Sequence, residues 1–382
     1  MNERHVVCVQ QRLTHYRERL FDDLRHSLAR LGITFDLVHG QPDGAAMKKR
    51  DAGVLTWAHA IENRYIALGS QTAVWQSLPQ QLTAPDLIIL TQENKLLANY
   101  GWLIRRRFQH TRVAFWGHGR NFQADRPDGL RERWKRMLVG QVDWWFAYTD
   151  LTRDILLGDG YPEERITVLD NAIDNEGFLA DLAVCSTEQL TALRSELGIG
   201  DNAPVGLFCG SLYADKRLPE MIAAADRIHA AIPAFHLIVV GDGPDAGVIH
   251  QASVSRPWLH AVGVRKGPEK AAYFRLANIV INPGAVGLHV LDAFCAGAPM
   301  ATMADSRHGP EIAYLRNGEN SLIAEGNPCA YADAVIALLT NTARYRRMQE
   351  SAHADASRYT LANMCERFAQ GIEKCLATPK KP

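Results

Sequence analysis

Short apolar runs alternate with longer segments of helical spacing along the first half of the chain. Because buried strands of parallel sheets are short and nearly continuously apolar, these runs predict strands, and the spacing between them predicts helices. The predicted strands cover residues 6–9, 35–38, 87–91, 113–116, 144–148 and 166–169, and the clearest predicted helices cover 20–31 and 130–139. This alternation indicates a mostly parallel sheet covered by helices on both faces.

A second series of the same kind begins at residue 205. Its predicted strands cover 205–209, 235–240, 261–262, 279–281 and 300–302, its predicted helices cover 218–231, 271–276 and 288–296, and residues 331–377 are helical almost throughout. We therefore expect an α/β protein with two doubly wound, Rossmann-like domains that face each other across a cleft. In such a pair a ligand binds at the carboxyl ends of the strands.

The polar stretch around residues 171–201 separates the two series and contains one helix-like segment at 187–197. It is interpreted as the connection between domains. We expect an N-terminal domain over 1–175, a linker over 176–200 and a C-terminal domain over 201–360. A last helical segment, 361–382, is expected to pack back towards the N-terminal domain.

Composition narrows the class of protein. The 382 residues are 47% hydrophobic and 22% charged, which excludes a disordered, collagen-like or small disulfide-stapled chain. The formal net charge is zero, which argues against a globally basic nucleic-acid-binding protein. Seven cysteines without paired spacing indicate reduced thiols and no zinc site. Because no apolar run is long enough for a signal peptide or a membrane span, we expect a cytoplasmic protein, with peripheral membrane contact left open.

The segment from Ile281 to Pro299, with the sequence INPGAVGLHVLDAFCAGAP, carries the most chemistry. A predicted strand leads into Asn-Pro-Gly, and a helix begins near Gly287. The free N–H groups and the dipole of a helix N-terminus suit an anion such as a diphosphate. Asp292, about one turn into the helix, has a carboxylate that can accept hydrogen bonds from vicinal hydroxyls. An ordinary strand–turn–helix whose glycines serve packing is an equally good interpretation of this segment alone.

This segment resembles the hallmark of the retaining GT-B glycosyltransferases often called family 4. That hallmark is a Glu, seven residues, a second Glu, a helix of small residues and Gly-x-Pro. Asp292 matches the second acid, whereas the first acid falls on Gly284. The resemblance implies that Asp292 binds the ribose of the nucleotide. The family's first acid binds hydroxyls of the donor sugar, and Gly284 at that position has no carboxylate to do so. Backbone N–H groups are expected to replace that acid, from Gly284, Ala285, Val286, Gly287 and Leu288.

The loop after the strand at 205–209 resembles the family's Gly-Arg turn with a Lys five residues after the Arg. Gly210 is present, Ser211 stands in the Arg position, and Lys216 is kept with Arg217 after it. Fixed cations would offset the charge that builds on a departing diphosphate. The alternative is that Lys216 and Arg217 form a solvated helix start.

Three further stretches match the family. Gly241 and Gly243 lie in its turn after the next strand; read alone they are a weak dinucleotide fingerprint, but the acid required about 20 residues on is missing. Val264 and Arg265 fall in the segment whose backbone reads the base. Glu311 belongs to the family's Pro-Glu-Ile turn and is expected to be structural.

In the first domain, His118 follows a predicted strand within the sequence FWGHGRN. It occupies the place of the family's donor-contacting histidine. A lone histidine is more often structural, and its position in a glycine loop at the end of a strand favours the functional role. Arg120 and Asn121 follow it and are expected on the acceptor side.

Near the N-terminus, His15, Tyr16 and Arg17 follow the first predicted strand and open a helix. They resemble the acceptor- and phosphate-facing loop of one branch of the family, in which a Tyr-Arg pair recurs. A plain helix start with exposed polar residues explains them equally well.

A basic segment runs from residue 105 to residue 136. It holds ten Lys/Arg residues and three acids, a local charge of +7 in a chain whose total is zero, with Trp134 among them. Such a patch attracts phosphates or an anionic lipid surface. A solvated helical face is the commoner explanation of a charge run.

The resemblance implies a hexosyltransferase-like enzyme that moves a sugar from a nucleotide diphosphate donor to an acceptor hydroxyl with retention of configuration. His118 and Lys216 are the expected catalytic residues, and the acceptor is expected to be a glycan, a glycolipid or a small molecule in bacterial glycan assembly. No Asp-x-Asp motif follows a predicted strand, so we expect neither metal nor cofactor. The alternatives are a sugar-nucleotide 2-epimerase on the same fold and a non-catalytic nucleotide-sugar-binding subunit.

Overall fold

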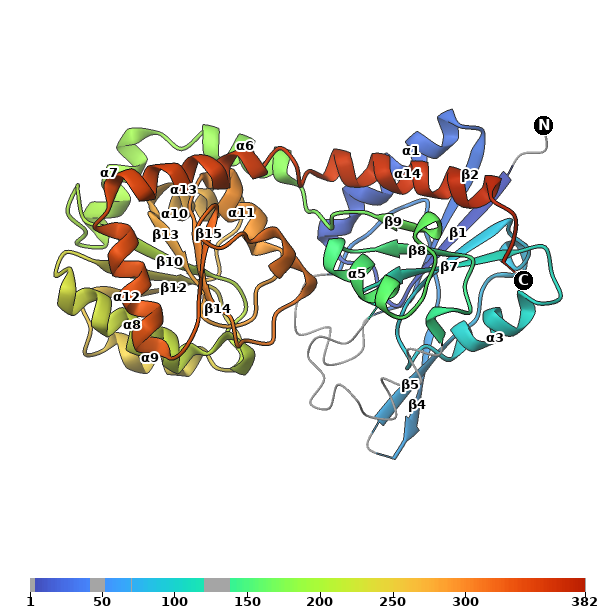
Figure 1. The fold of residues 1–382 in the computed structure, drawn as a ribbon, viewed down its shortest axis with the longest axis horizontal. Helices are drawn as coiled ribbons and strands as arrows, with labels where there is room; N and C mark the ends of the chain where they lie inside the picture. The colour runs from blue at the N-terminus through green and yellow to red at the C-terminus, as the bar shows by residue number, and fades with distance from the viewer. Residues whose placement is uncertain (1–3, 42–51, 70, 120–137, 382) are drawn as a thin grey trace. The chain divides into compact units, whose positions relative to one another are not determined.

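The computed structural model describes residues 4–41, 52–69, 71–119 and 138–381 (Figure 1). The chain divides into two compact units. The first comprises residues 1–173 and 361–382, and the second comprises residues 174–360. Each unit is described by itself.

The first unit is built on a seven-stranded sheet in the order β3-β2-β1-β6-β7-β8-β9, and every neighbouring pair is parallel. The order runs backwards to β1 and then forwards from β6, as in a doubly wound Rossmann sheet. The strands are β1 (Arg4–Gln10), β2 (Ile33–His39), β3 (His59–Ala60), β6 (Leu87–Thr91), β7 (Arg112–Gly117), β8 (Trp144–Ala147) and β9 (Ile166–Val168). The central strands are buried on both faces, which explains their continuous apolar runs.

Helices of the first unit cover this sheet. They are η1 (His15–Arg17), α1 (Glu18–Arg30), η2 (Gln80–Leu82), α3 (Leu97–Arg105), α5 (Asp150–Gly158), η3 (Glu163–Arg165) and α14 (Leu361–Ala377). The C-terminal helix α14 packs against α1, β8 and β9 (Figure 1). Gly371 makes this approach possible, because a Cβ there would lie 2.6 Å from Oγ1 of Thr167 and 2.8 Å from the ring of Phe146.

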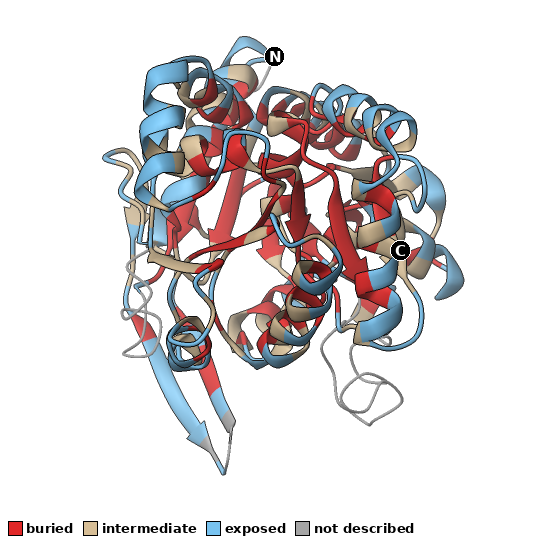
Figure 2. Ribbon diagram, turned by 90° about the vertical axis from the view of Figure 1, so that its left-hand side faces the viewer, coloured by how far each residue is buried: buried red, intermediate tan, exposed pale blue. Residues whose placement is uncertain are grey.

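An antiparallel hairpin in the first unit has no counterpart among the predicted elements. Its strands are β4 (Asn63–Leu68) and β5 (Gln71–Gln76). The buried side chain of Asn63 anchors it by donating hydrogen bonds to the carbonyl oxygens of Gln11 and Gln41, both at 2.9 Å. Much of β4 is exposed (Figure 2).

The second unit repeats the architecture with a six-stranded parallel sheet in the order β12-β11-β10-β13-β14-β15. Its strands are β10 (Val205–Cys209), β11 (His236–Val240), β12 (Leu259–Gly263), β13 (Ile279–Ile281), β14 (Met300–Met303) and β15 (Ser321–Ala324). The order reverses between β10 and β13. In a doubly wound sheet ligands bind beside this switch point, outside the carboxyl ends of the strands.

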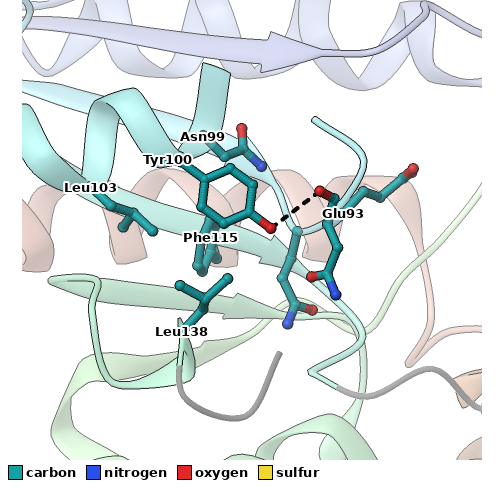
Figure 3. Close-up of a pocket in the computed structure, with 8 residues that line it drawn as sticks. Glu93, Asn99, Tyr100, Leu103, Phe115 and Leu138 are labelled. Carbon is teal, nitrogen blue, oxygen red and sulfur yellow. Dashed lines mark hydrogen bonds between the residues drawn. The ribbon is translucent and has the colours of Figure 1, made fainter. Parts of the chain in front are cut away.

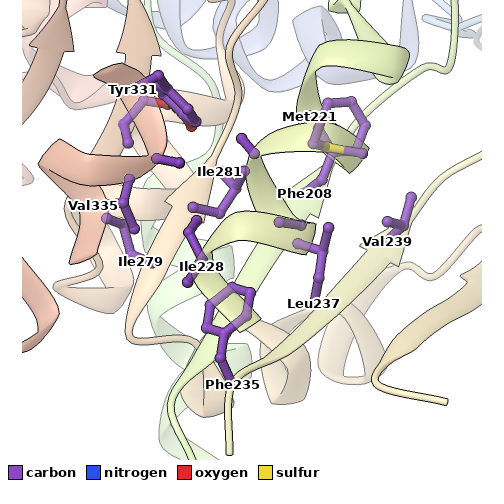
Figure 4. Close-up of a cluster of buried hydrophobic side chains, with 14 of the residues drawn as sticks. Phe208, Met221, Ile228, Phe235, Leu237, Val239, Ile279, Ile281, Tyr331 and Val335 are labelled. Carbon is purple, nitrogen blue, oxygen red and sulfur yellow. Dashed lines mark hydrogen bonds between the residues drawn. The ribbon is translucent and has the colours of Figure 1, made fainter. Parts of the chain in front are cut away.

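The helices of the second unit cover both faces of its sheet. They are α6 (Asn175–Ala183), α7 (Thr187–Glu196), η4 (Ala214–Lys216), α8 (Leu218–Ala231), α9 (Ala246–Ser253), α10 (Gly267–Leu276), α11 (His289–Ala296), η5 (Pro310–Tyr314), α12 (Pro328–Leu339) and α13 (Thr342–Asp355). Side chains from α8 and α12 meet those of the strands in one apolar core (Figure 4), for example Ile228, Val335 and Leu237.

The structure confirms the predicted class of two doubly wound, Rossmann-like parallel-sheet domains, and it corrects the predicted linker. Residues 176–200 contain α6 and α7, which pack against α10, and α6 also packs against α11. The buried side chains of Phe178 and Leu182 tie α6 to the second unit. The predicted helix at 130–139 falls mostly outside the described residues. Among the described residues, no helix has the length and apolar character needed to cross a membrane.

Candidate functional site at the carboxyl ends of the second sheet

The predicted donor-binding residues lie in the segments that follow β10, β11, β12 and β13, with Asp292 on the helix α11 after β13. Since these four strands are parallel neighbours, their carboxyl ends share one edge of the sheet. The loops after β10 and β13 flank the switch point. The structure therefore places these residues where a doubly wound domain binds its ligand.

Gly284 lies too close to the neighbouring backbone to carry any side chain. A Cβ at this position would overlap the carbonyl oxygen of Asp215 and the backbone of Lys216. The N–H of Ala285 donates to that same carbonyl oxygen of Asp215 at 2.8 Å. The space next to the first acid position is therefore filled by the turn η4, which gives a physical reason for the broken acid pair.

The loop between β13 and α11 is pinned through its carbonyl groups. The buried side chain of Asn282 donates to the carbonyl oxygen of Ala285 at 3.2 Å, and Oγ1 of Thr302 donates to that of Gly284 at 3.3 Å. Oγ of Ser306 donates to the carbonyl oxygen of Pro283 at 2.6 Å. These bonds fix the path of the loop before any ligand binds.

The structure corrects the predicted row of five ligand-binding N–H groups. The N–H of Ala285 already bonds Asp215, and the N–H of Val286 donates to Nδ1 of His308 at 3.3 Å. Within the described residues, the N–H groups of Gly284, Gly287 and Leu288 have no hydrogen-bond partner. Gly287 and Leu288 directly precede the first residue of α11, so their N–H groups lie at the N-terminal end of that helix and are donors available to an anion.

Lys216 lies beneath this loop. Its ammonium group is buried and donates to the carbonyl oxygen of Ala285. Burial lowers the pKa of Lys216 to about 8, and the nearby carboxylate of Glu311 opposes that shift. Lys216 is therefore mostly charged at pH 7 and adjoins the N-terminal end of α11. Glu311 is buried in η5, in keeping with the structural role expected for it.

Arg217 has a different partner from the one predicted. Its backbone is left-handed, with φ of 52°, just before α8. Its guanidinium forms a two-point ion pair with Asp305, with N–O distances of 2.7 and 3.1 Å. The charge expected to offset a diphosphate is thus already neutralised by a carboxylate.

Asp292 is buried at the first turn of α11. It forms an ion pair with Nζ of Lys270 at 3.1 Å, and that nitrogen lies 4.4 Å from the ring centroid of Phe178. Burial raises the pKa of Asp292, and the ammonium of Lys270 opposes the rise. Lys270 was not singled out from the sequence, because a lysine 22 residues away on a helix carries no local signal of this contact.

The glycines after β10 and β11 bring two loops together. A Cβ at Gly241 would overlap the carbonyl oxygen of Gly210, and one at Gly243 would overlap that of Leu212. The N–H of Leu212 donates to the carbonyl oxygen of Asp242 at 2.9 Å. Close loop packing therefore requires Gly241 and Gly243, whatever they contribute to a ligand.

The remaining predicted donor-binding residues have solvent access at the same edge of the sheet. Ser211 follows Gly210 and is exposed. Val264 is 53% exposed after β12. Nε of Arg265 lies 3.8 Å from the carboxylate of Glu269.

In the first unit, His118 lies in the loop after β7 and is exposed. Its ring centroid lies 4.2 Å from that of Tyr148, which follows β8. The loop is held by Gln92, whose Nε2 donates to the carbonyl oxygen of Gly119 at 3.2 Å. His118 therefore stands at the carboxyl edge of the first sheet, as predicted from its position, while Arg120 and Asn121 lie outside the described residues.

The structure corrects the predicted acceptor role of Arg17. Its guanidinium is buried, hydrogen-bonds the side chain of Asn171 and donates to the carbonyl oxygen of Ala172 at 3.3 Å. Arg17 thus ties η1 to the segment after β9. His15 and Tyr16 are exposed and remain predicted acceptor-binding residues.

Two hollows in the first unit lie away from these residues. One, between α3 and β7 (Figure 3), is lined by residues including Tyr100, Leu103 and Phe115 and has a volume of about 10 Å³, room for a water molecule and not for a sugar. The other, about 400 Å³, lies between β9 and α14. Among the described residues, no group of three or more His, Cys, Asp or Glu side chains is arranged to hold a metal ion.

Comparison with known protein families and curated relatives gives an independent assignment. Residues 18–176 match the family described as Glycosyltransferase Family 4, and residues 203–341 match the family described as Glycosyl transferases group 1. The D-inositol 3-phosphate glycosyltransferase of Nocardia farcinica is 25% identical over 339 residues, which cover 79% of this chain and 72% of that protein. The alpha-monoglucosyldiacylglycerol synthase of Acholeplasma laidlawii is 24% identical over 148 residues, 37% of this chain and 36% of that protein.

Solved structures share the fold at low sequence identity. Anabaena Alr3699/HepE in complex with UDP superposes with a TM-score of 0.70 at 16% identity, over 97% of this chain and 99% of that chain. The UDP-GlcNAc 2-epimerase of Neisseria meningitidis, bound to UDP-GlcNAc, superposes with a TM-score of 0.61 at 14% identity, over 97% and 100% of the two chains. These similarities establish the two-domain fold.

Proposed function

Because this chain is a glycosyltransferase built on the GT-B fold, we propose that it moves a sugar from a nucleotide diphosphate donor to an acceptor hydroxyl with retention of anomeric configuration. One observation supports this most strongly. The free N–H groups of Gly287 and Leu288, the buried ammonium of Lys216 and the carboxylate of Asp292 all lie at the switch point of the second sheet. This combination suits a nucleoside diphosphate.

The reaction breaks the bond between the anomeric carbon and the diphosphate oxygen, and it forms a bond from that carbon to the acceptor oxygen. The leaving diphosphate takes the bonding electron pair and accepts the proton of the acceptor hydroxyl on the same face of the sugar. The N–H groups of Gly287 and Leu288, with Lys216, stabilise the charge that develops. This route requires neither a carboxylate nucleophile nor a metal ion.

The remaining roles follow the sequence-based assignment. Asp292 accepts hydrogen bonds from the ribose hydroxyls, and His118 contacts the donor sugar. Exposed His15 and Tyr16 take part in acceptor binding, together with residues of the loop that begins at Arg120.

We also propose that the acceptor is a phosphorylated or lipid-linked compound in bacterial glycan or glycolipid assembly, reached from the cytoplasmic face of an anionic membrane. The names of two relatives, an inositol phosphate glycosyltransferase and a diacylglycerol glycolipid synthase, support this choice. At the described start of the basic segment, exposed Arg105 and Arg107 are flanked by two exposed apolar side chains, Ile104, 63% exposed, and Phe108, 84% exposed. Apolar side chains flanked by cations suit an anionic bilayer surface.

Not every cation of that segment is available to lipid. Arg106 is buried and forms an ion pair with Asp143 at 2.8 Å, and Arg112 donates to the carbonyl oxygen of Thr378 at 3.1 Å. The residues of the segment from 120 to 136 lie outside the described part of the chain.

A panel of nucleoside diphosphates and their sugars tests the proposed activity. The thermal midpoint of unfolding is measured with UDP, GDP and ADP compounds and with CMP sugars as the monophosphate control. A ligand at 100 times its dissociation constant adds about 2.7 kcal/mol to the free energy of unfolding. We expect one diphosphate series to raise the midpoint and its sugar to be transferred with retention, read from the anomeric coupling of the product by NMR. Failure of all diphosphates to bind would contradict the proposal.

A sugar-nucleotide 2-epimerase is the second candidate, because an epimerase shares the fold over nearly the whole chain. Donor turnover that needs no acceptor and releases free sugar or an epimer would favour it. The filled space at Gly284 and the missing Arg at Ser211 keep a non-catalytic binding subunit as a third candidate. Nucleotide binding without transfer to any acceptor, unchanged by substitution of His118 or Lys216, would favour that candidate.

A further inference from the structure

A buried imidazole nitrogen beside the candidate donor site has no partner. Nε2 of His289 is buried and makes no hydrogen bond within the described residues. His289 is the first residue of α11 and directly follows the free N–H groups of Gly287 and Leu288. A buried polar atom without a partner costs stability, so such an atom in a native protein calls for an explanation.

The charges around His289 are cationic. Lys216 on η4 and Lys270 on α10 are close enough to act on it. Burial, with these two ammonium groups, holds the pKa of His289 well below its usual value, so the ring is neutral at pH 7. The carboxylates nearby have other partners: Asp292 pairs with Lys270, and Glu311 acts on Lys216.

The loop offers no other polar side chain at this point. Residues 284–288 are Gly, Ala, Val, Gly and Leu, and Gly284 has no room for a side chain. His289 is therefore the first side chain after Asn282 and Pro283 that could reach a ligand with a polar atom. The Nδ2 of Asn282 is committed to the loop carbonyl groups, and its buried Oδ1, which has no partner, is an acceptor that an anionic oxygen cannot bond.

We propose that His289 is a donor-binding residue whose Nε2–H donates a hydrogen bond to an oxygen of the diphosphate, an inference that rests on the proposed function. A neutral imidazole carries one N–H, and an anionic oxygen, which the charges of Lys216 and Lys270 would favour here, would satisfy it. The contact adds a side chain to the two backbone donors of Gly287 and Leu288.

Replacement by leucine separates this role from a structural one. If Nε2 forms a hydrogen bond only with a bound ligand, His289→Leu removes an unpaired polar atom from the ligand-free protein. The thermal midpoint of unfolding of that protein should then stay the same or rise. The same variant should bind UDP, GDP or ADP, whichever binds the wild type, and inorganic pyrophosphate at least tenfold more weakly. A structural histidine would show the opposite pattern: a lower midpoint and unchanged affinity.

Two further variants complete the experiment. His289→Gln keeps a side-chain N–H donor and should retain affinity within about threefold of wild type. His229→Leu is the matched control in the same unit, because its Nδ1 lies 2.9 Å from the carbonyl oxygen of Phe235 and its ring stacks on Trp258. It should lower the midpoint and leave affinity unchanged.

Calorimetric titration of the four proteins decides the outcome. Affinity of His289→Leu within twofold of wild type overturns the role of His289 and leaves the proposed function standing. If the wild type binds none of these diphosphates, the proposed function fails and this inference with it. If His289→Leu does not fold, His289→Gln and a third variant, His289→Asn, decide the outcome. The donor-binding role stands only if both variants fold and His289→Asn binds the diphosphate tenfold more weakly than the wild type. Any other result means that His289 is structural.

Discussion

The ammonium group of Lys216 donates a hydrogen bond to the carbonyl oxygen of Ala285, directly beneath the loop that leads into α11. The backbone of η4, the turn that contains Lys216, also packs against Gly284. One short segment, η4, therefore both fills the space next to the lost acid and supplies the buried cation of the candidate site.

Restoring the acid of the family pattern should damage this chain. We expect Gly284→Glu to lower the free energy of unfolding by about 3 kcal/mol, because its Cβ overlaps the backbone of η4. Urea denaturation measures the change. Gly287→Ala is the control, since a Cβ there meets only Nδ1 of His289, at 4.0 Å, and its cost should stay below about 1 kcal/mol. A stable Gly284→Glu protein with higher activity would contradict this account of the site.

Lys216→Met should abolish most of the activity. It removes the buried cation, so kcat/KM should fall by about 100- to 1,000-fold, as when a donor to a developing anion is lost. It also removes one of the two side-chain donors to the carbonyl oxygen of Ala285, the other being Asn282, which should cost about 1 kcal/mol of stability. Transfer assays and urea denaturation check the two effects; activity within threefold of wild type would remove Lys216 from the mechanism.

The pH profile should show the titration of Lys216. Its pKa in the folded chain is about 8, so kcat/KM of the wild type should fall as pH rises above 8 and the ammonium is lost. Stability should move the other way. Because the unfolded chain holds this proton up to about pH 10.5, the folded chain binds fewer protons between pH 8 and 10.5, and the free energy of unfolding rises across that window. Both features should be missing in Lys216→Met.

Variants of Asp292 and Lys270 should have different effects: the first on ligand affinity and the second on stability. Asp292→Asn keeps the shape of the side chain and weakens acceptance from ribose hydroxyls, so nucleoside diphosphate affinity should fall about tenfold while pyrophosphate affinity stays within threefold. Lys270→Met leaves the Asp292 carboxylate buried without its partner and should cost about 3 kcal/mol in urea denaturation. Equal losses of both ligands in Asp292→Asn would contradict a ribose contact.

If the protein contacts membranes as proposed, only substitutions at the C-terminal end of α3 and just after it should weaken binding to vesicles. Ile104→Ser with Phe108→Ser, or Arg105→Glu with Arg107→Glu, should reduce co-sedimentation with phosphatidylglycerol vesicles at least tenfold. Val254→Ser, at a position 88% exposed in the second unit, and Arg346→Glu with Arg347→Glu on α13 are the matched controls. Binding that is unaffected by the first pair of variants, or absent from the wild type, would rule this surface out as a membrane contact.

The local sequence pattern predicted those helices and strands that consist of a continuous run of buried apolar residues. The strands at 205–209 and 279–281 and the helix at 218–231 occur with the predicted ends, because proline, glycine or polar residues lie within two positions of both ends of each. The hairpin of β4 and β5 was missed because its exposed strand mixes Arg64 with Tyr65 and Ile66 and shows no strict alternation. The linker was wrong although α7 was predicted as a helix-like segment at 187–197, because the packing of α6 and α7 against α10 depends on distant elements that local pattern does not reveal.

The site was predictable in its position and only partly in its contacts. The pattern of glycines and Asp292 after the strand at 279–281 predicted a helix N-terminus near Gly287, and the structure has a helix that begins at His289. The pairing of Arg217 with Asp305, 88 residues away, and of Asp292 with Lys270 depends on how distant elements pack. The burial of Arg17 is likewise set by α14 and the segment after β9, which local pattern does not reveal.

A crystal soaked with the nucleoside diphosphate that raises the thermal midpoint is the most direct check on where the leaving group sits. Electron density for its phosphates should lie within about 2.7–3.2 Å of the backbone nitrogens of Gly287 and Leu288. Phosphate density at any other place on the chain, with this helix tip left empty, would contradict the account.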